Sequence, residues 1–436
     1  MVPRKIESNI GECGHVGSSS NERLSCKRWR TRSYRVPLHQ QLGIDSAWWC
    51  SSDHGVVWVW LDRSFFLALQ HDPMIFTPTL FVDPDAIAAN WLLLDSWHRA
   101  AGGRACGAAV KADAYGVGLN LAAPALFEVG CRHFFTATID EAIVLRELLP
   151  EAWISVLNGL TPELAQKNIL PVLNSIGDVE RWRRFAYEAE RKVPAVLHVD
   201  TGMARLGLDA QEFLHLAERP ELLSGISLDF VMTHLAAAEL PQAAQNIDQA
   251  VRFRTIEATF PGIRTSLANS AGIFLGARFA SDLARPGYAL YGGNPTPGHK
   301  NPMRSVIRLA APVIQVRDIP VGASVGYNAT WVATRKTRVA TLGIGYADGI
   351  LRAASGRLVA RHRGVQIKQI GRISMDLMTF DVTEHPDIGP GSILDLLDDT
   401  ITIETMAKAA ETSGYEILTS LGKRYRRVLE HGYTGA

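Results

Sequence analysis

Strand-like and helix-like stretches alternate from residue 74 to about residue 292, and this alternation restricts the fold more than any other feature of the chain. Eight short apolar runs have the composition of strands: 106–111, 134–138, 154–157, 169–173, 195–199, 230–233, 265–268 and 289–291. Between most of them lie stretches with helical character: 84–100, 139–148, 178–190 and 242–259. Eight strand–helix units predict a parallel (β/α)8 barrel, with a doubly wound open sheet as the alternative.

The pattern changes after residue 300. Residues 306–316 and 338–343 have the composition of strands, Gly and Pro punctuate the segments between them, and helical periodicity stays weak until 403–413. This pattern predicts a second, mainly β domain. We therefore expect the barrel at 74–300 and the β domain at 301–436.

Residues 1–73 differ in composition from the rest of the chain. They hold five of the ten Trp and three of the five Cys, and residues 23–35 carry six basic side chains and no acidic one. No helical or strand period runs through residues 1–50, and polar residues follow Arg4 and Lys5 where a signal peptide would be apolar. We expect an unstructured extension or a start codon assigned too early. A basic nucleic-acid-binding arm is the alternative.

Charge and composition exclude several classes of protein. Lys plus Arg number 45 and Asp plus Glu 44, so the formal net charge is +1, and polyanion-binding proteins normally carry a basic excess. No apolar run approaches the roughly 20 residues of a membrane-spanning helix. Five Cys do not make a disulfide scaffold. We expect a cytoplasmic protein without nucleic-acid or membrane partners.

Common cofactor motifs are missing from the sequence. There is no Cys pair at CxxC spacing and no HExxH, so no metal site is expected. No GxGxxG opens a helix and no GxxxxGK[ST] occurs, which argues against NAD and ATP enzymes.

Polar residues follow several of the expected strands at the point where each strand ends. They are Lys111, Asp200-Thr201, His234, Asn269-Ser270 and, near the last strand, Arg285-Pro286-Gly287. In a (β/α)8 barrel the carboxyl ends of the strands form the active-site face. Their repetition at one level of the barrel favours a site over isolated surface residues.

Three of these positions indicate a chemistry. A buried Lys111 with a lowered pKa could act as a nucleophile, although a lysine extending to solvent is the alternative. The turn at Arg285–Gly287, with Ser270, lies where this fold binds phosphate, unless it is only a structural turn. Tyr327 could act as a base if neighbouring cations or donors lower its pKa, unless it too belongs to an ordinary turn.

Together the motifs resemble those of the alanine racemases. Residues 110–116 (VKADAYG) resemble the lysine motif that binds pyridoxal 5'-phosphate (PLP) in that family. Further matching segments follow in order from residue 79 to about 429: 200–207 (DTGMARLG), 233–234, 268–271, 285–287, 291–292, 326–327, 345–349 (GYADG), 371–376 (GRISMD) and 421–425 (LGKRY). Only the extension is unmatched.

The resemblance implies a homodimeric PLP enzyme that interconverts L-alanine and D-alanine and supplies D-alanine for bacterial peptidoglycan. Each active site would join the barrel of one chain to the β domain of the other. Lys111 would hold PLP covalently and serve the face from which the D proton leaves, whereas Tyr327 of the neighbouring chain would serve the L face. PLP would act as the electron sink.

The remaining site residues are also implied by the resemblance. Those that would bind the phosphate are Tyr115, Ser270 and the backbone of Gly287 and Tyr288, with Asn269 beside them. Arg285 would bond the pyridine nitrogen and leave it unprotonated, because an arginine keeps its charge. His234 would support Arg285 and the catalytic tyrosine. Arg205 and the backbone of Met375 would face the substrate carboxylate and the phenolic oxygen.

Two positions depart from the family pattern. Several members have a lysine seven residues before Arg205, which can be carbamylated and orients that arginine; His198 stands there and excludes a lysine carbamate. The last phosphate-binding tyrosine of the family is expected where Leu429 stands. We expect either weaker PLP binding or compensation by Tyr425 or Tyr433.

Other functions remain alternatives. A PLP-dependent decarboxylase would carry a Glu at the pyridine nitrogen and a Cys in its β domain, but residues 300–436 contain no Cys. A non-catalytic PLP-binding protein would lack the second domain, and an inactive homologue would be expected to lose Lys111 or Tyr327. A broad-specificity amino-acid racemase stays open.

Overall fold

The computed structural model of the chain describes residues 34–36, 47–52, 55–59 and 77–432. The chain divides into two units, Met1–Met74 and Ile75–Ala436, and each is described by itself. Three short strands of the first unit, β1 (Tyr34–Val36), β2 (Ala47–Ser52) and β3 (Gly55–Val59), form an antiparallel sheet. The expectation for residues 1–73 as a whole stays a prediction, because most of them lie outside the described ranges.

The strands of the barrel are parallel neighbours in chain order. The first is interrupted at Gly107 and comprises β5 (Ala105–Cys106) and β6 (Ala108–Ala109). It is followed by β7 (His133–Thr136), β8 (Trp153–Val156), β9 (Ile169–Leu173), β10 (Val193–His198), β11 (Ile226–Met232) and β12 (Arg264–Ser266). The sheet runs from β6 to β12 without a crossover, which confirms the barrel and excludes the doubly wound order.

The eighth strand is β13 (Leu283–Ala284), which pairs in parallel with β5 and brings the sheet back to its first strand. The Gly107 N–H donates to the Ala284 carbonyl at 2.9 Å, and the Arg285 N–H donates to the Ala268 carbonyl at 2.8 Å. The sequence prediction of a strand at 289–291 was wrong, because Tyr288–Tyr291 is a 3-10 helix. Its apolar residues are buried, and burial alone does not distinguish a strand from a short helix.

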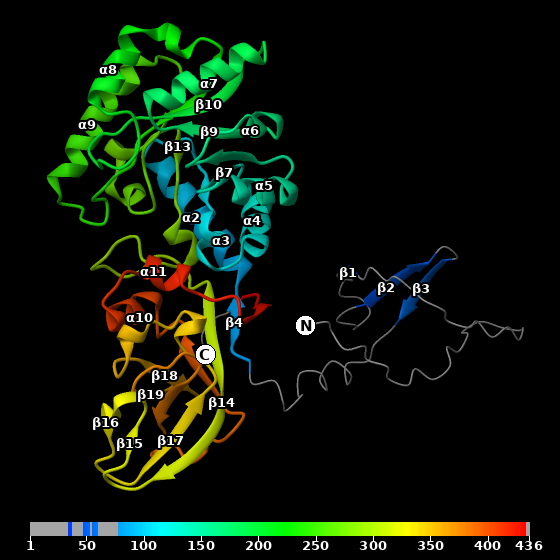
Figure 1. Cartoon of the computed structure of the whole chain (residues 1–436), viewed down its shortest axis with the longest axis vertical. Coiled ribbons are helices and arrows are strands. Elements are labelled where there is room, and N and C mark those ends of the chain that lie inside the picture. The colour runs from blue at the N-terminus through cyan, green and yellow to red at the C-terminus, as the bar shows by residue number, and fades with distance from the viewer. Residues whose placement is uncertain (1–33, 37–46, 53–54, 60–76, 433–436) are drawn as a thin grey trace, which may run out of the picture. The chain divides into compact units, whose positions relative to one another are not determined.

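Helices cover the outside of the barrel (Figure 1). They are α2 (Pro84–Ala100), α4 (Leu119–Glu128), α5 (Ile139–Leu148), α6 (Pro162–Gln166), α7 (Ile176–Glu188), α8 (Ala210–Glu218) and α9 (Ala244–Thr259). The predicted bounds of α2 and α5 match the structure. Both helices begin at a side-chain cap: Asp83 accepts from the Ala86 N–H, and Thr138 and Glu141 form a capping box.

The C-terminal domain contains an eight-stranded sheet, which confirms the mainly β prediction. The strand order is β17 (Thr337–Leu342), β20 (Met378–Asp381), β19 (Val365–Ile370), β18 (Val359–His362), β21 (Ile393–Leu397), β14 (Ile307–Ile319), β4 (Thr79–Val82) and β22 (Arg426–Leu429). The long β14 also pairs with β17, so the sheet curls back on itself. A short hairpin of β15 (Ser324–Val325) and β16 (Trp331–Val332) pairs separately.

Strand β4 precedes the barrel in the chain but belongs to the C-terminal sheet, where it pairs with β14 and β22 (Figure 1). Residues 79–82 therefore contribute a strand to the sheet of the C-terminal domain. One apolar cluster extends from barrel residues such as Ile87 and Tyr291 to Leu309 and Leu418 of the C-terminal domain. This shared core fixes helices α10 (Ile403–Ala410) and α11 (Gly414–Thr419) against the barrel.

Within the described segments, no helix is both long enough and apolar enough to cross a bilayer.

Candidate active site

A cavity of about 680 Å³ lies where the barrel strands end. It brings together nine of the residues that the sequence singled out: Lys111, Tyr115, Arg205, His234, Asn269, Ser270, Arg285, Gly287 and Tyr288. These residues follow the ends of five strands, β6, β10, β11, β12 and β13, and lie between positions 111 and 288 of the sequence. The folded barrel therefore assembles this part of the predicted site.

Lys111 follows β6 and begins a single left-handed turn, α3 (Lys111–Tyr115). Ala112, Asp113, Ala114 and Tyr115 all have φ between 53° and 56°, a conformation that costs L-residues roughly 1–2 kcal/mol each. The Glu141 carboxylate accepts from the Ala112 N–H at 2.6 Å and so ties the start of this turn to α5. Strain of this kind is retained where surrounding contacts impose it, often at active sites.

The Lys111 amine has an environment that favours its neutral form. Burial lowers its pKa, the positive charge of Arg205 lowers it further, and Glu141 acts in the opposite direction. A larger fraction of neutral amine makes a lysine a better nucleophile and base.

Arg285 follows β13, is buried, and is held by hydrogen bonds. One terminal nitrogen donates to the Ser266 hydroxyl at 2.5 Å, and the other donates to the Thr233 carbonyl at 2.5 Å and lies 3.3 Å from Nδ1 of His234. Burial lowers the pKa of Arg285 to about 10, so the guanidinium stays charged at neutral pH. Burial first, and then the charge of Arg285, lower the pKa of His234 well below its ordinary value, so this imidazole is neutral.

Ser270, Gly287 and Tyr115 form a cradle for an anion. The Ser270 hydroxyl oxygen accepts from the N–H groups of Gly287 and Ala289 at 3.0 and 3.2 Å, which leaves its proton available as a donor. A side chain at Gly287 would overlap the Tyr115 hydroxyl, so only glycine allows the two to approach. Burial raises the pKa of Tyr115 to about 12 and keeps its hydroxyl protonated.

His198 lines the cavity as a neutral imidazole. Its Nδ1 lies 2.8 Å from Oδ1 of Asn174, whose amide nitrogen donates to the carbonyls of Leu157 and Val172. Because the amide nitrogen is committed to these carbonyls, Oδ1 accepts, and Nδ1 of His198 carries the proton. Burial, with smaller effects from nearby arginines, lowers the pKa of His198 to about 4.

Tyr415 of α11 is a cavity residue that sequence reasoning missed. Its ring stacks on Tyr288 with centroids 4.2 Å apart, and its hydroxyl donates to Glu239 at 2.8 Å. Leu429, where the family pattern has its last phosphate-binding tyrosine, lies in β22, is 48% exposed and does not line the cavity, and the expected effect on PLP binding stays a prediction. Tyr425 is buried outside the cavity lining, and Tyr433 lies outside the described residues. Tyr415 reaches the cavity only through packing between the domains, which no local pattern reveals.

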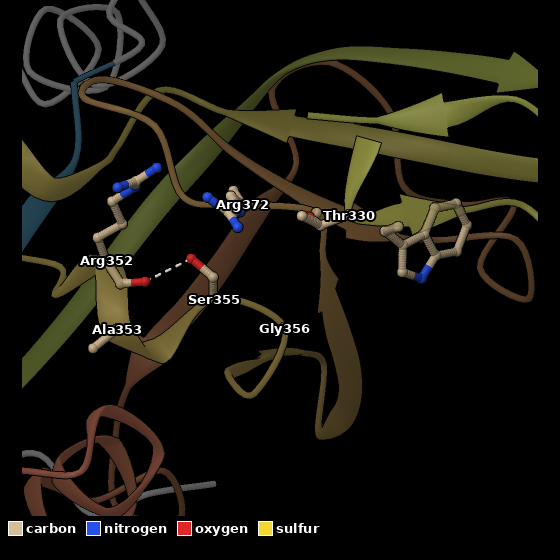
Figure 2. Close-up of a pocket in the computed structure, with 8 residues that line it drawn as sticks. Thr330, Arg352, Ala353, Ser355, Gly356 and Arg372 are labelled. Atoms are coloured by element: carbon tan, nitrogen blue, oxygen red, sulfur yellow. Dashed lines mark hydrogen bonds between the residues drawn. The ribbon is translucent and has the colours of Figure 1, made fainter. Parts of the chain in front are cut away.

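Tyr327 and Met375 do not join the barrel cavity. Both lie in the C-terminal domain, 66% and 53% exposed. Tyr327 borders a separate cavity of about 540 Å³ together with Arg372. Figure 2 shows residues that line a further cavity of about 560 Å³, among them Arg352, whose carbonyl accepts a hydrogen bond from the Ser355 hydroxyl. Within one chain, the two candidate bases therefore occupy different surfaces.

No cluster of three metal-ligating side chains occurs among the residues that the structure covers.

Comparisons with known proteins agree with the motifs. The chain matches the family described as alanine racemase, N-terminal domain, over residues 82–295 and alanine racemase, C-terminal domain, over 306–429. It is 55% identical to an alanine racemase of Acidiphilium cryptum over 81% of this chain and 99% of the relative. It is 42% identical to a catabolic alanine racemase of Agrobacterium fabrum, over 80% and 91% of the two chains.

Solved structures agree as well. An alanine racemase from Bartonella henselae with covalently bound pyridoxal phosphate aligns with a TM-score of 0.78 and 38% identity, over 81% of this chain and 99% of that one. A biosynthetic alanine racemase from Pseudomonas aeruginosa aligns with a TM-score of 0.76 and 29% identity, over 82% and 100%. With both domains matched and relatives aligned almost end to end, the chain belongs to the alanine racemase family.

Proposed function

We propose that the protein binds PLP in the barrel cavity and interconverts L-alanine and D-alanine. The observation that carries this proposal is the pairing, in one cavity, of a lysine with a lowered pKa and a buried, charged arginine. The relatives named above are alanine racemases, and the structure from Bartonella henselae carries PLP covalently.

The residues present fit the cofactor. Lys111 supplies an amine whose lowered pKa favours the neutral form. Ser270, Tyr115 and the turn at Gly287 supply hydrogen-bond donors for a phosphate. Tyr415 and Tyr288, stacked together, close the same end of the cavity. When bound, PLP withdraws electrons from the substrate and makes the proton on Cα acidic.

Arg285 limits how far the cofactor withdraws electrons. We expect its guanidinium to face the pyridine nitrogen and, because it keeps its charge to about pH 10, to leave that nitrogen unprotonated. The neutral His234 beside it adds no second charge. A carboxylate in this place would have the opposite effect and favour side reactions, and its absence argues against a decarboxylase.

Inversion at Cα requires acid/base groups on opposite faces. Lys111 serves one face from within the cavity. We propose that Tyr327 of a second copy of the chain serves the other, because Tyr327 is exposed in its own chain and borders a different cavity. The functional unit is then a homodimer, in which each site combines the barrel of one chain with the C-terminal domain of the other.

Arg205 lines the cavity and is exposed on its open side. We propose that it binds the substrate carboxylate together with the backbone of Met375 from the second copy. The neutral pair of His198 and Asn174 lies in the same cavity, so no lysine carbamate can orient Arg205 there. In the cell we expect the product D-alanine to supply peptidoglycan, while the name of the Agrobacterium fabrum relative points to a catabolic role as the alternative.

Spectra and isotope exchange test the proposal. Purified protein should contain PLP in a covalent bond that sodium borohydride makes permanent, and peptide mapping should find the label on Lys111. In deuterated water, L-alanine should racemise with deuterium incorporated at Cα. The assay repeated across several amino acids separates an alanine racemase from a broad-specificity one. Covalent PLP without Cα exchange would leave a carrier protein and contradict the proposal.

A further inference from the structure

Three motifs of the C-terminal domain, 345–349, 371–376 and 421–425, meet at one buried carboxylate. Asp348 is 2% exposed. Both of its oxygens accept from Arg424, at 2.6 Å from Nε and 2.9 Å from a terminal nitrogen. The other terminal nitrogen of Arg424 donates to Asp376 at 2.8 Å. One guanidinium therefore links all three motifs through side chains that are distant in sequence.

The backbones of the first two motifs are in direct contact at this point. The Tyr346 N–H donates to the Ser374 carbonyl and the Ala347 N–H to the Met375 carbonyl, both at 3.0 Å. Asp348 also accepts from the Gly345 N–H at 2.9 Å. A side chain at Gly345 would overlap the carbonyls of Ser374 and Met375. The position of the Met375 peptide is thus set by the loop that Asp348 anchors.

The third motif is joined to this loop by its backbone. The Gly422 N–H donates to the Asp348 carbonyl at 3.0 Å. A side chain at Gly349 would overlap the carbonyl of Ser420. The hydrogen bonds to Asp348 and Asp376 raise the pKa of Arg424, so the guanidinium stays charged.

Met375 and Tyr346 lie on an exposed face of these loops, whereas the carboxylate that holds the loops together is buried. Met375 and Tyr346 are 53% and 42% exposed, whereas Asp348 beneath them is buried. Under the proposed function, this face enters the active site of the second copy. A backbone group can orient a substrate only if the residues beneath it are held rigidly, and the hydrogen bonds to Asp348 hold the Met375 peptide in this way.

We propose that Arg424 is a positioning residue for racemisation: through Asp348 and Asp376 it holds the Met375 peptide in place for the substrate in the site of a second copy of the chain. The inference rests on the proposed function. Arginine is suited to this task because its planar fork makes three fixed hydrogen bonds, which a lysine cannot reproduce.

Steady-state kinetics of the PLP-loaded dimer test the role. Arg424→Gln and Arg424→Lys should raise KM for alanine at least tenfold and lower kcat less than threefold, with unchanged PLP content. Asp376→Asn, which leaves the buried Asp348 paired, should give a smaller rise of about threefold in KM. Arg426→Gln is the matched control, since Arg426 is an exposed arginine two residues away, and it should change neither constant.

Subunit mixing separates positioning from a general loss of folding. A dimer of Arg424→Gln and Lys111→Ala chains contains one site with an intact barrel and an intact C-terminal domain, and that site should show the wild-type KM. A dimer of Arg424→Gln and Tyr327→Phe chains has no such site and should not. Mixing Lys111→Ala with Tyr327→Phe checks the shared site itself, so its failure would be distinguished from failure of this inference.

Two results would overturn the role of Arg424. One is a KM for Arg424→Lys and Asp376→Asn that equals that of the Arg426→Gln control. The other is recovery of the wild-type KM with the Tyr327→Phe partner as well as with the Lys111→Ala partner. If Arg424→Gln does not fold, the two milder variants carry the same test.

Discussion

The barrel cavity and the surface around Tyr327 differ in how complete they are within one chain. The cavity is lined on most sides, and burial shifts the pKa values of Lys111, His234 and Arg285 inside it. Tyr327 is 66% exposed, and the structure places it away from that cavity. One chain therefore builds the barrel cavity by itself but presents Tyr327, the proposed second base, to the outside, as one half of a shared site would.

Loss of the cavity lysine should have the largest effect. We expect Lys111→Ala to abolish covalent PLP and to lower racemisation by roughly a thousandfold or more, because one residue supplies both the covalent link and a base. Borohydride reduction followed by peptide mapping and a coupled racemisation assay measure the two losses. A borohydride-stable label at normal yield in this variant would contradict the assignment of the cavity.

Loss of the exposed Tyr327 should remove the acid/base group on only one face of Cα. Tyr327→Phe should slow racemisation in both directions by roughly a hundredfold or more, while PLP content stays normal. Lys111 should still exchange the Cα proton of D-alanine in deuterated water, and nuclear magnetic resonance measures that exchange. Equal loss of exchange from both enantiomers would show that the two residues do not serve opposite faces.

Lowering the pH should destabilise the barrel, because buried histidines would have to take up protons. Burial lowers the pKa of His198 to about 4 and of His133 to about 3. A lowered folded-state pKa means that their contribution to stability is present above about pH 6.5 and is lost as the pH falls toward 4, by about 1.4 kcal/mol for each pKa unit.

We therefore expect the melting temperature to fall over this range, and His133→Gln to show a shallower fall, because glutamine has no proton to gain. Thermal unfolding between pH 4 and 7 gives the measurement, with His431, an exposed histidine, as the control position. If the melting temperature of His133→Gln falls with pH as steeply as that of the wild type, His133 does not contribute to the acid sensitivity.

Removal of the first unit should have the smallest effect. The family match begins at residue 82, and the relative from Acidiphilium cryptum aligns over 99% of its own length without the extension. A chain that starts at Met74 should keep its PLP content, dimerisation and racemisation rate within about twofold. Gel filtration and the coupled assay check it, and loss of the dimer would show that residues 1–73 are a working part of the protein.

The sequence predicted what local patterns encode. The helical character of 84–100 and 139–148 predicted the bounds of α2 and α5, and in the structure the caps Asp83 and Thr138 mark where these helices begin. The strand-end residues of the cavity were found because barrel geometry places all strand ends on one face.

What the sequence could not reveal depends on contacts between distant segments. Strand β13 has only two residues and carries no period. Strand β4 joins the C-terminal sheet through pairing with β14, which no local pattern encodes. Tyr415 lines the cavity only because α11 packs on the barrel. The family pattern had placed a phosphate-binding tyrosine at position 429 instead, in β22.

The central claim is that each active site takes its two bases from two chains. The most direct measurement mixes inactive Lys111→Ala and Tyr327→Phe chains under conditions of demonstrated subunit exchange. Random pairing makes half of the dimers mixed, each with one intact site, so the account predicts recovery of about a quarter of the wild-type activity. No recovery despite exchange would place Lys111 and Tyr327 in the site of a single chain and contradict the account.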